Sequence, residues 1–199
     1  MTLSISRVRA VLAVILLGLL VSGCGYNNIP TLQEQANAKW ADVQNNYQRR
    51  ADLIPNLVAT VKGYAKQEKD VLTSVVEARA KATQVKIDVS QLTDPAKLKQ
   101  FQDAQNQLSG ALGRLLAVSE NYPDLKSNQN FLALQSQLEG TENRITVARR
   151  DYIEAVRAYN TELKTFPGIL WASTVFRGNK PMAAFAANDN AQTPPQVKF

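Results

Sequence analysis

Apolar side chains recur every three or four positions along most of this chain, a pattern that predicts long amphipathic helices. The first apolar stripe passes through Ala36, Trp40, Val43 and Tyr47 and continues in the same phase as far as Ala78. No segment alternates apolar and polar residues in the way that a half-buried strand would. The pattern therefore favours an all-α fold.

A proline lies inside this first stripe without shifting its phase. Pro55 removes one helical hydrogen bond and crowds the carbonyl group of Ala51, four residues earlier. We therefore expect a bend here and a single long helix over residues 31–82, rather than a chain reversal. Thr31 and Glu34 have the spacing of a capping box at the start of that helix.

Two further stripes follow, each with helix-start signals before it. Asp94 and Pro95 mark the second start, and Ser127 or Asn128 can cap the third helix. The predicted core positions on these stripes are Leu108, Leu112, Leu115, Leu134, Leu138 and Ile145. Spacing close to 3.5 residues and short connections predict an antiparallel bundle of three to four long helices with coiled-coil-like packing, the first helix long and kinked.

The N-terminus has the features of a lipoprotein signal peptide. Arg7 and Arg9 precede an apolar run over residues 10–21, which is short for a membrane span. The sequence VSGC, which ends at Cys24, has the form of a lipobox. We therefore predict a signal peptide over residues 1–23 and a lipidated tether over 24–30.

In that prediction Cys24 becomes an N-acylated S-diacylglycerol cysteine and the chain resides in the cell envelope. Gly25 rather than aspartate follows the cysteine, which in a Gram-negative cell favours the periplasmic face of the outer membrane. The alternative is an uncleaved signal anchor with an incidental cysteine.

The end of the chain differs in composition from the helical region. We assign residues 31–166 to the bundle, 167–187 to an aromatic segment and 188–199 to a polar tail expected to be disordered. Trp171, Phe176 and Phe185 either contact a bilayer or partner, or cover the open end of the bundle.

Composition excludes several classes of chemistry. The 199 residues include no histidine and one cysteine, so histidine-based catalysis and zinc sites of paired cysteines and histidines are unavailable. A di-iron bundle site also needs histidines. The net charge is +6, with basic residues interleaved among acids, so no nucleic acid partner is expected. We expect no metal and no cofactor, and we place Glu68 in an ion pair with Arg144 or Arg149.

A set of motifs in the mature chain resembles the LemA family. They are RRADLIPNLV at 49–58, VKGYA at 61–65, EAR at 77–79, YPDLK at 122–126, NF at 130–131, TENRI at 141–145, ARRDY at 148–152, YN at 159–160 and FP at 166–167. The resemblance implies a bundle of long helices on the outer side of a membrane and no established catalytic activity. Relatives commonly keep an N-terminal transmembrane helix, whereas this chain carries a lipobox.

The partner-binding candidates fall into three groups. Trp40, Val43 and Tyr47 lie on the part of the long first helix that we expect to be least covered. Asp52 and Asn56 flank Pro55, where they either form a recognition surface or satisfy the bent backbone. The last group comprises Tyr122 and Asp124 at a helix end and Trp171 and Phe176 in the aromatic segment.

These observations favour a non-enzymatic envelope lipoprotein that presents helical surface to other envelope proteins or to a second copy of itself. One alternative is a hydrolase that uses serine, lysine or carboxylates, which would need a concave pocket with convergent polar groups. Another is a membrane-shaping role for the aromatic segment.

Overall fold

The computed structural model describes residues 25–186, which contain helices and no strand. Four α-helices are long: α2 (Asn28–Tyr64), α3 (Lys69–Gln84), α4 (Pro95–Ser119) and α6 (Gln129–Glu162). Three elements are short: the 3-10 turn η1 (Val89–Gln91), α5 (Pro123–Lys126) and α7 (Gly168–Thr174). The all-α prediction is confirmed. The expected signal peptide, Cys24 and the polar tail lie outside the described residues.

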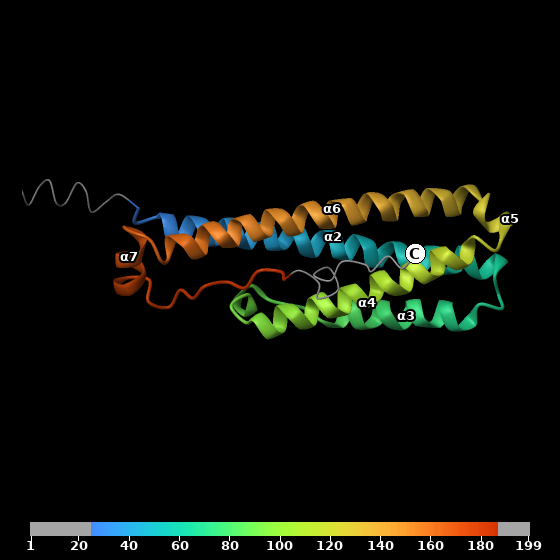
Figure 1. The fold of residues 1–199 in the computed structure, drawn as a ribbon, viewed down its shortest axis with the longest axis horizontal. Coiled ribbons are helices and arrows are strands. Elements are labelled where there is room, and N and C mark those ends of the chain that lie inside the picture. Colours follow the sequence, from blue (N-terminus) through green and yellow to red (C-terminus); the bar gives the residue numbers. More distant parts are fainter. Residues whose placement is uncertain (1–24, 187–199) are drawn as a thin grey trace, which may run out of the picture.

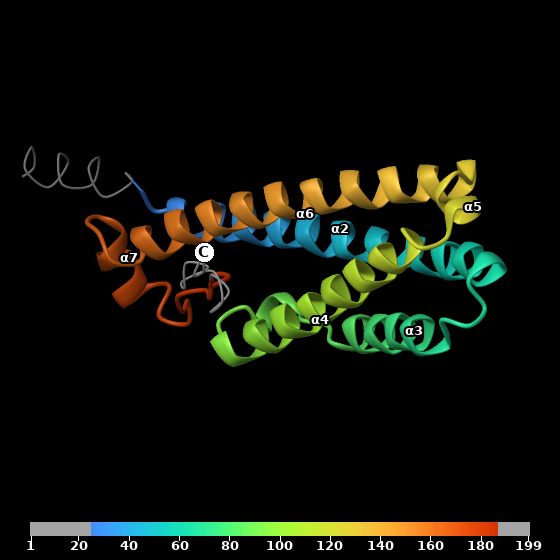
Figure 2. The same cartoon turned by 45° about the vertical axis from the view of Figure 1, so that its right-hand side comes forward.

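The long helices run alternately up and down the molecule. Helices α2 and α6 lie antiparallel and side by side along most of their length (Figure 1). Helices α3 and α4 form a second antiparallel pair over the α5 end of α2 and α6 (Figure 2). The segment that follows α7 runs back toward this second pair. None of the described helices is both long and apolar enough to cross a bilayer.

The predicted single helix over residues 31–82 is wrong. Helix α2 ends at Tyr64, four residues form a turn, and α3 then packs back against α2. Periodicity could not reveal this reversal, because Leu72 and Val75 occupy helical positions whether the chain continues or turns. Folding back buries both side chains (7% and 0% exposed), whereas a straight continuation would carry them past the end of α6.

The helix-start predictions had mixed outcomes. Asp94 caps α4 by accepting hydrogen bonds from the backbone N–H groups of residues 96 and 97 at 2.9 and 3.4 Å. Asn128 caps α6 through the N–H of Phe131 at 3.0 Å. The capping box at Thr31 is wrong, because α2 begins at Asn28 without a side-chain cap.

The apolar core consists of two clusters placed one after the other along the molecule. The first contains Trp40, Tyr152 and Phe185 and lies toward the α7 end. The second lies between α2, α3, α4 and α6, toward α5. Of the core residues predicted from the two later stripes, five are buried and Leu134 is partly buried. Polar side chains occupy the space between the clusters, and they form the candidate site.

Candidate functional site

A layer of buried polar residues crosses the bundle between the two apolar clusters. Arg50 on α2, Gln105 on α4 and Thr141 on α6 each stand where an apolar stripe passes mid-bundle. Their exposed fractions are 1%, 5% and 2%. Burying such groups costs free energy unless they are hydrogen-bonded, so the layer requires specific partners.

Arg50 is the centre of this layer. Its Nη1 donates to the Ser109 hydroxyl at 2.7 Å and to the Glu142 carboxylate at 2.8 Å. Its Nη2 donates to Oε1 of Gln105 at 2.6 Å and to the Gln105 carbonyl at 3.2 Å. The guanidinium also lies over the ring of Tyr47, 5.1 Å from its centroid. One cation therefore joins α2, α4 and α6.

Gln105 extends the layer to the fourth long helix. Its side-chain amide donates to the carbonyl of Ala82, near the end of α3, at 3.2 Å. The Thr141 hydroxyl is satisfied within α6, where it donates to the carbonyl of residue 137 at 2.7 Å. Every long helix thus contributes to the layer.

A second arginine repairs the backbone at Pro55. Because proline has no N–H, the carbonyl of Ala51 lacks its helical partner. The Nε of Arg79 on α3 donates to that carbonyl oxygen at 2.7 Å. Helix α2 continues through the proline without a break. The freed carbonyl is therefore satisfied by α3, not by Asp52 or Asn56.

Arg79→Ala is expected to lower the free energy of unfolding by about 1–3 kcal/mol, because it leaves a partly buried carbonyl without a donor. Pro55→Ala restores an N–H at position 55 that can bond the same carbonyl. In that background we expect the Arg79→Ala loss to shrink by roughly 1 kcal/mol in a double-mutant cycle. Arg150→Ala, at an exposed arginine on α6, is the control. Equal losses of stability in the two backgrounds would show that the hydrogen bond from Arg79 to the Ala51 carbonyl does not compensate for Pro55.

A separate polar cluster closes the α5 end of the bundle. The Tyr122 hydroxyl donates to Glu68 at 2.8 Å and accepts from the Gln67 amide at 2.8 Å. The Asn128 amide donates to the Tyr64 hydroxyl at 2.9 Å. The hydrogen bond to Glu68 raises the pKa of Tyr122. Glu68 is thus held by a tyrosine, which corrects the expected ion pair with Arg144 or Arg149.

The structure corrects the first group of partner-binding candidates. Trp40, Val43 and Tyr47 are 1%, 0% and 6% exposed and belong to the first apolar cluster. We had expected this part of α2 to overhang the other helices. Instead α6 extends beside it, and the segments around Ile87 and Phe185 cover the remaining side.

The other candidates have different surroundings. Asp52, Asn56 and Asp124 are exposed, and Tyr122 is half-buried in the cluster just described. Asp52 accepts a hydrogen bond from the Gln48 amide at 2.7 Å. Trp171 and Phe176 are half-buried against the ring of Tyr26, at centroid distances of 5.3 and 5.5 Å. Phe185 is buried among Trp40 and Tyr152. The aromatic rings therefore pack inward against the chain.

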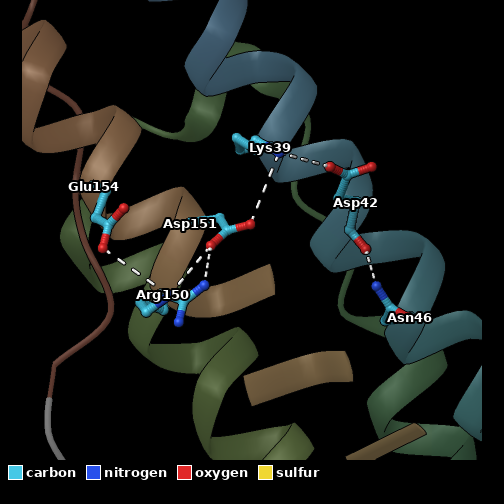
Figure 3. A network of polar contacts seen from close by, with 6 residues as sticks. All are labelled: Lys39, Asp42, Asn46, Arg150, Asp151 and Glu154. Atoms are coloured by element: carbon cyan, nitrogen blue, oxygen red, sulfur yellow. Dashed lines mark hydrogen bonds and ion pairs between the residues drawn. The ribbon is translucent and has the colours of Figure 1, made fainter. Parts of the chain in front are cut away.

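Ion pairs line the outer surface where α2 and α6 meet (Figure 3). Lys39 contacts Asp42 at 3.5 Å on its own helix and Asp151 on α6 at 3.9 Å. Arg150 contacts Asp151 at 3.0 Å and Glu154 at 4.0 Å. Exposed pairs of this kind contribute little stability, so this face is a solvated charged surface. Residues 25–186 contain no group of three acids or cysteines placed to hold a metal ion.

A groove of about 270 Å³ lies beside the polar layer, between α2, the end of α3 and the start of α4. Tyr47, Phe101 and Gln105 line it together with other glutamines and small side chains. Lys86 is the one charged side chain in its lining. The groove offers polar contacts, but its lining does not pair an acid with a base.

Arg50 and Pro55 lie within the motif at 49–58, and Glu142 lies within the motif at 141–145. A comparison of the chain with known families agrees with the resemblance that these motifs carry. A model of the LemA family matches residues 39–199. The chain belongs to the LemA family.

Curated relatives include the magnetosome proteins MamQ 2 of Paramagnetospirillum magneticum and MamQ of Magnetospirillum gryphiswaldense. They are 27% and 25% identical over 84% and 71% of this chain, and 65% and 58% of their own lengths. Protein LemA of Metamycoplasma hominis is 25% identical over 62% of this chain and 52% of its own length. The chain therefore spans less than two thirds of the relatives it matches.

Several residues of this LemA-family site were not singled out from the sequence. Arg79, Ser109 and Glu142 lie off the apolar stripes, so periodicity gave no reason to place them in the interior. The sequence does indicate the polar layer itself, because Arg50 is a charged residue at a position of the apolar stripe that faces the core. A buried arginine needs a carboxylate partner, and Glu142 lies within a motif at the matching height of the antiparallel helix.

The LemA-family chain should unfold more easily in alkali. Burial raises the pKa of Tyr47, Tyr152 and Tyr159 above the ordinary value of 10.0. In the unfolded chain these phenols ionise near pH 10, whereas the folded chain keeps them protonated. Stability is therefore fully present below pH 10 and falls as the pH rises above it, by at most about 1.4 kcal/mol per pH unit for each tyrosine.

Denaturant titrations at about pH 9 and about pH 11 would measure this loss. Tyr152→Phe removes one ionisable group and should make the decline with pH shallower. A free energy of unfolding that stays constant across this range would contradict the assignment.

Proposed function

We propose that this LemA-family protein is a membrane-tethered envelope lipoprotein without enzymatic activity, which acts as a helical scaffold or adaptor for other envelope proteins. Cys24 carries the lipid in this proposal, and in a Gram-negative cell the domain faces the periplasm from the outer membrane. The observation that carries the proposal is the position of Gly25, the residue after Cys24, beside Pro167 in the turn between α6 and α7, which lies at one end of the elongated bundle.

An anchor at that end would hold the bundle upright from the membrane. Helix α2 has 37 residues and α6 has 34, which correspond to lengths of about 50–55 Å at 1.5 Å per residue. The exposed candidates Asp52, Asn56 and Asp124 lie from the middle of the bundle to its α5 end. An anchored bundle would present these side chains well away from the bilayer, which suits contact with other proteins.

The interior of the bundle also supports a scaffold. Both terminal nitrogens of Arg50 and the side-chain amide of Gln105 are occupied by hydrogen bonds within the layer, so these residues serve the packing of the helices. The groove beside the layer lacks the convergent acid and base that hydrolysis would need.

The anchor is tested by Cys24→Ala with metabolic labelling by a palmitate analogue. We expect loss of the label and accumulation of the unprocessed precursor. Ser22→Ala keeps a small residue in the lipobox and should retain the label. Unchanged labelling of Cys24→Ala would show that Cys24 is not the lipid attachment site.

The scaffold role is tested by photo-crosslinking in intact cells. A crosslinking residue at position 56 or 124 should give discrete adducts with envelope proteins. The matched control is position 107, an exposed glutamine on α4. Equal patterns at all three positions, or none at any, would argue against a specific docking surface at these residues.

A further inference from the structure

Large apolar side chains are exposed together at the end of the bundle where α2 begins and α6 ends. Phe166, Ile169, Leu170 and Val175 are 77%, 45%, 53% and 53% exposed, and all lie within or beside α7. Tyr26, 42% exposed, lies at the same end. We call the four residues of positions 166–175 the α7 face. A concentrated apolar surface of this kind marks a contact with a protein or a membrane.

The turn before α7 holds the start of α7 close against the end of α6. Gly168 is buried against α6, and a Cβ added there would lie 2.2 Å from the carbonyl oxygen of Glu162. Only glycine allows so close an approach. Trp171 uses the inner side of α7 to pack edge-on against Tyr26 at 5.3 Å. Ile169 and Leu170 lie on other sides of α7 and are left exposed.

Cations outnumber acids around the α7 face, where the carboxylate of Glu162 lies against Gly168. Residues 163–186 include Lys164, Arg177 and Lys180 and contain no aspartate or glutamate. All three cations are exposed. Apolar side chains next to an excess of cations are typical of protein surfaces that lie on anionic phospholipid.

The start of the described chain lies against the same turn. A Cβ placed on Gly25 would be 3.0 Å from Cγ of Pro167, so the backbone of Gly25 touches the turn before α7. The Asn28 amide donates to the Glu162 carboxylate at 3.2 Å and ties the start of α2 to the end of α6. Consecutive Cα atoms are about 3.8 Å apart, so a lipid on Cys24 begins beside the α7 face.

We propose that the α7 face inserts into the headgroup region of the bilayer, with Lys164, Arg177 and Lys180 on anionic phosphates. This inference rests on the proposed lipid anchor at Cys24. The anchor brings this end of the bundle to the membrane, so the bilayer is the occupant rather than a second copy. With two attachments side by side, the lipid and the α7 face, the bundle has a fixed orientation relative to the membrane.

Tryptophan quenching by brominated lipid tests the contact. The full lipidated chain is reconstituted into phosphatidylcholine–phosphatidylglycerol vesicles whose acyl chains carry bromine. The chain has two tryptophans. Trp171 lies behind the α7 face, and Trp40 is buried about 18 Å along α2 from its first residue. We expect loss of roughly half of the total emission, since one of the two indoles lies at interfacial depth. Trp171→Phe should abolish the quenching.

Two sets of variants separate the apolar contact from the charge. Ile169→Glu/Leu170→Glu should lose most of the quenching while the protein still floats with the vesicles. Leu132→Glu is the matched control, because Leu132 is 48% exposed on α6 near the opposite end. Lys164→Glu/Lys180→Glu should weaken quenching in the mixed vesicles and have little effect in pure phosphatidylcholine.

Flotation and quenching together distinguish the two proposals. Flotation without quenching of Trp171 would leave the anchor in place and overturn the α7 contact. Failure of the wild-type chain to float would overturn the anchor, and the α7 contact with it. If the Ile169→Glu/Leu170→Glu variant instead converts a dimer in detergent to a monomer and quenching is unchanged, the α7 face joins two copies and the proposal is wrong.

Discussion

Trp40→Ala is expected to lower the free energy of unfolding by about 3–5 kcal/mol. The indole is 1% exposed and lies 5.4 Å from the ring of Phe101, 5.3 Å from Tyr152 and 6.0 Å from Phe185. Its Nε1 donates to the carbonyl of Ile87 at 3.2 Å. Truncation removes these ring contacts, leaves a cavity in the first apolar cluster, and removes one of the two donors to the carbonyl of Ile87, which the Gln44 amide also bonds at 3.0 Å. Denaturant titration of the full chain in detergent, followed by circular dichroism, measures the loss.

Two variants show whether the loss comes from burial. Trp40→Phe keeps an aromatic ring in the cluster and should cost less than the alanine variant. Trp171→Ala removes the other tryptophan, which is only half-buried, and should also cost less. A partner-binding tryptophan on an uncovered helix face would give a change within about 0.5 kcal/mol. Such a small value for Trp40→Ala would instead support the prediction that Trp40 lies uncovered and binds a partner.

Trp40 illustrates what periodicity can and cannot establish. The stripe correctly identified which face of α2 is apolar, because helical spacing depends on neighbouring residues alone. What covers that face depends on segments far away in the sequence. The ring of Phe185 reaches Trp40 across 145 positions, from a segment with no helical pattern of its own. No local signal could have placed it there.

The reversal after Tyr64 was missed for a related reason. Residues 65–68 contain neither proline nor glycine, so the usual signals of a turn are absent within them. The turn is stabilised by contacts that form only in the folded bundle, such as the hydrogen bond of Glu68 with Tyr122 at 2.8 Å. Helix starts with a local cap, at Asp94 and Asn128, were in contrast predictable.

The polar layer was partly predictable. Arg50, Gln105 and Thr141 occupy positions on the apolar stripes of the sequence, and all three are buried. That these three residues lie at the same level of the bundle could be recognised only once the chain reversals were known, because successive antiparallel helices run in opposite directions. The role of Arg79 was beyond the sequence, since it needed the turn after Tyr64 to bring α3 back beside Pro55.

Arg50→Ala is the second substitution for which we expect a large effect, a loss of about 3–5 kcal/mol in the free energy of unfolding. The side chain is 1% exposed and satisfies acceptors on two other helices. Its removal leaves the side-chain oxygen of Gln105 buried without its donor and opens a cavity beside Tyr47. Denaturant titration and thermal unfolding of the full chain both measure this loss.

The contribution of the Glu142 ion pair can be separated from that of the buried hydrogen bonds. Glu142→Gln should cost less than Arg50→Ala, because the side chain at 142 is 45% exposed and the new amide oxygen can still accept a hydrogen bond from Arg50, although the buried guanidinium loses its counter-charge. Arg50→Lys keeps the charge but cannot reproduce the forked contacts to Ser109 and Gln105, so it should remain clearly destabilised. If Glu142→Gln were as damaging as Arg50→Ala, the ion pair would dominate instead.

The decisive comparison replaces the buried partners together. Suppose that the Arg50→Ala loss comes chiefly from the Gln105 side-chain oxygen, which is left buried without its donor. In that case Arg50→Leu/Gln105→Leu should be more stable than Arg50→Ala, because the double variant has no such oxygen and its apolar side chains fill the layer. Ser109 and Glu142 retain access to water in either variant. Because the double variant also removes the Gln105 donor from the carbonyl of Ala82, Gln105→Leu alone is the control for that loss. The double variant would join the two apolar clusters into one continuous core and remove the hydrogen bonds that match α2 to α4. A double variant no more stable than Arg50→Ala would show that the attraction of the arginine itself, rather than the satisfaction of its partners, holds the middle of the bundle together.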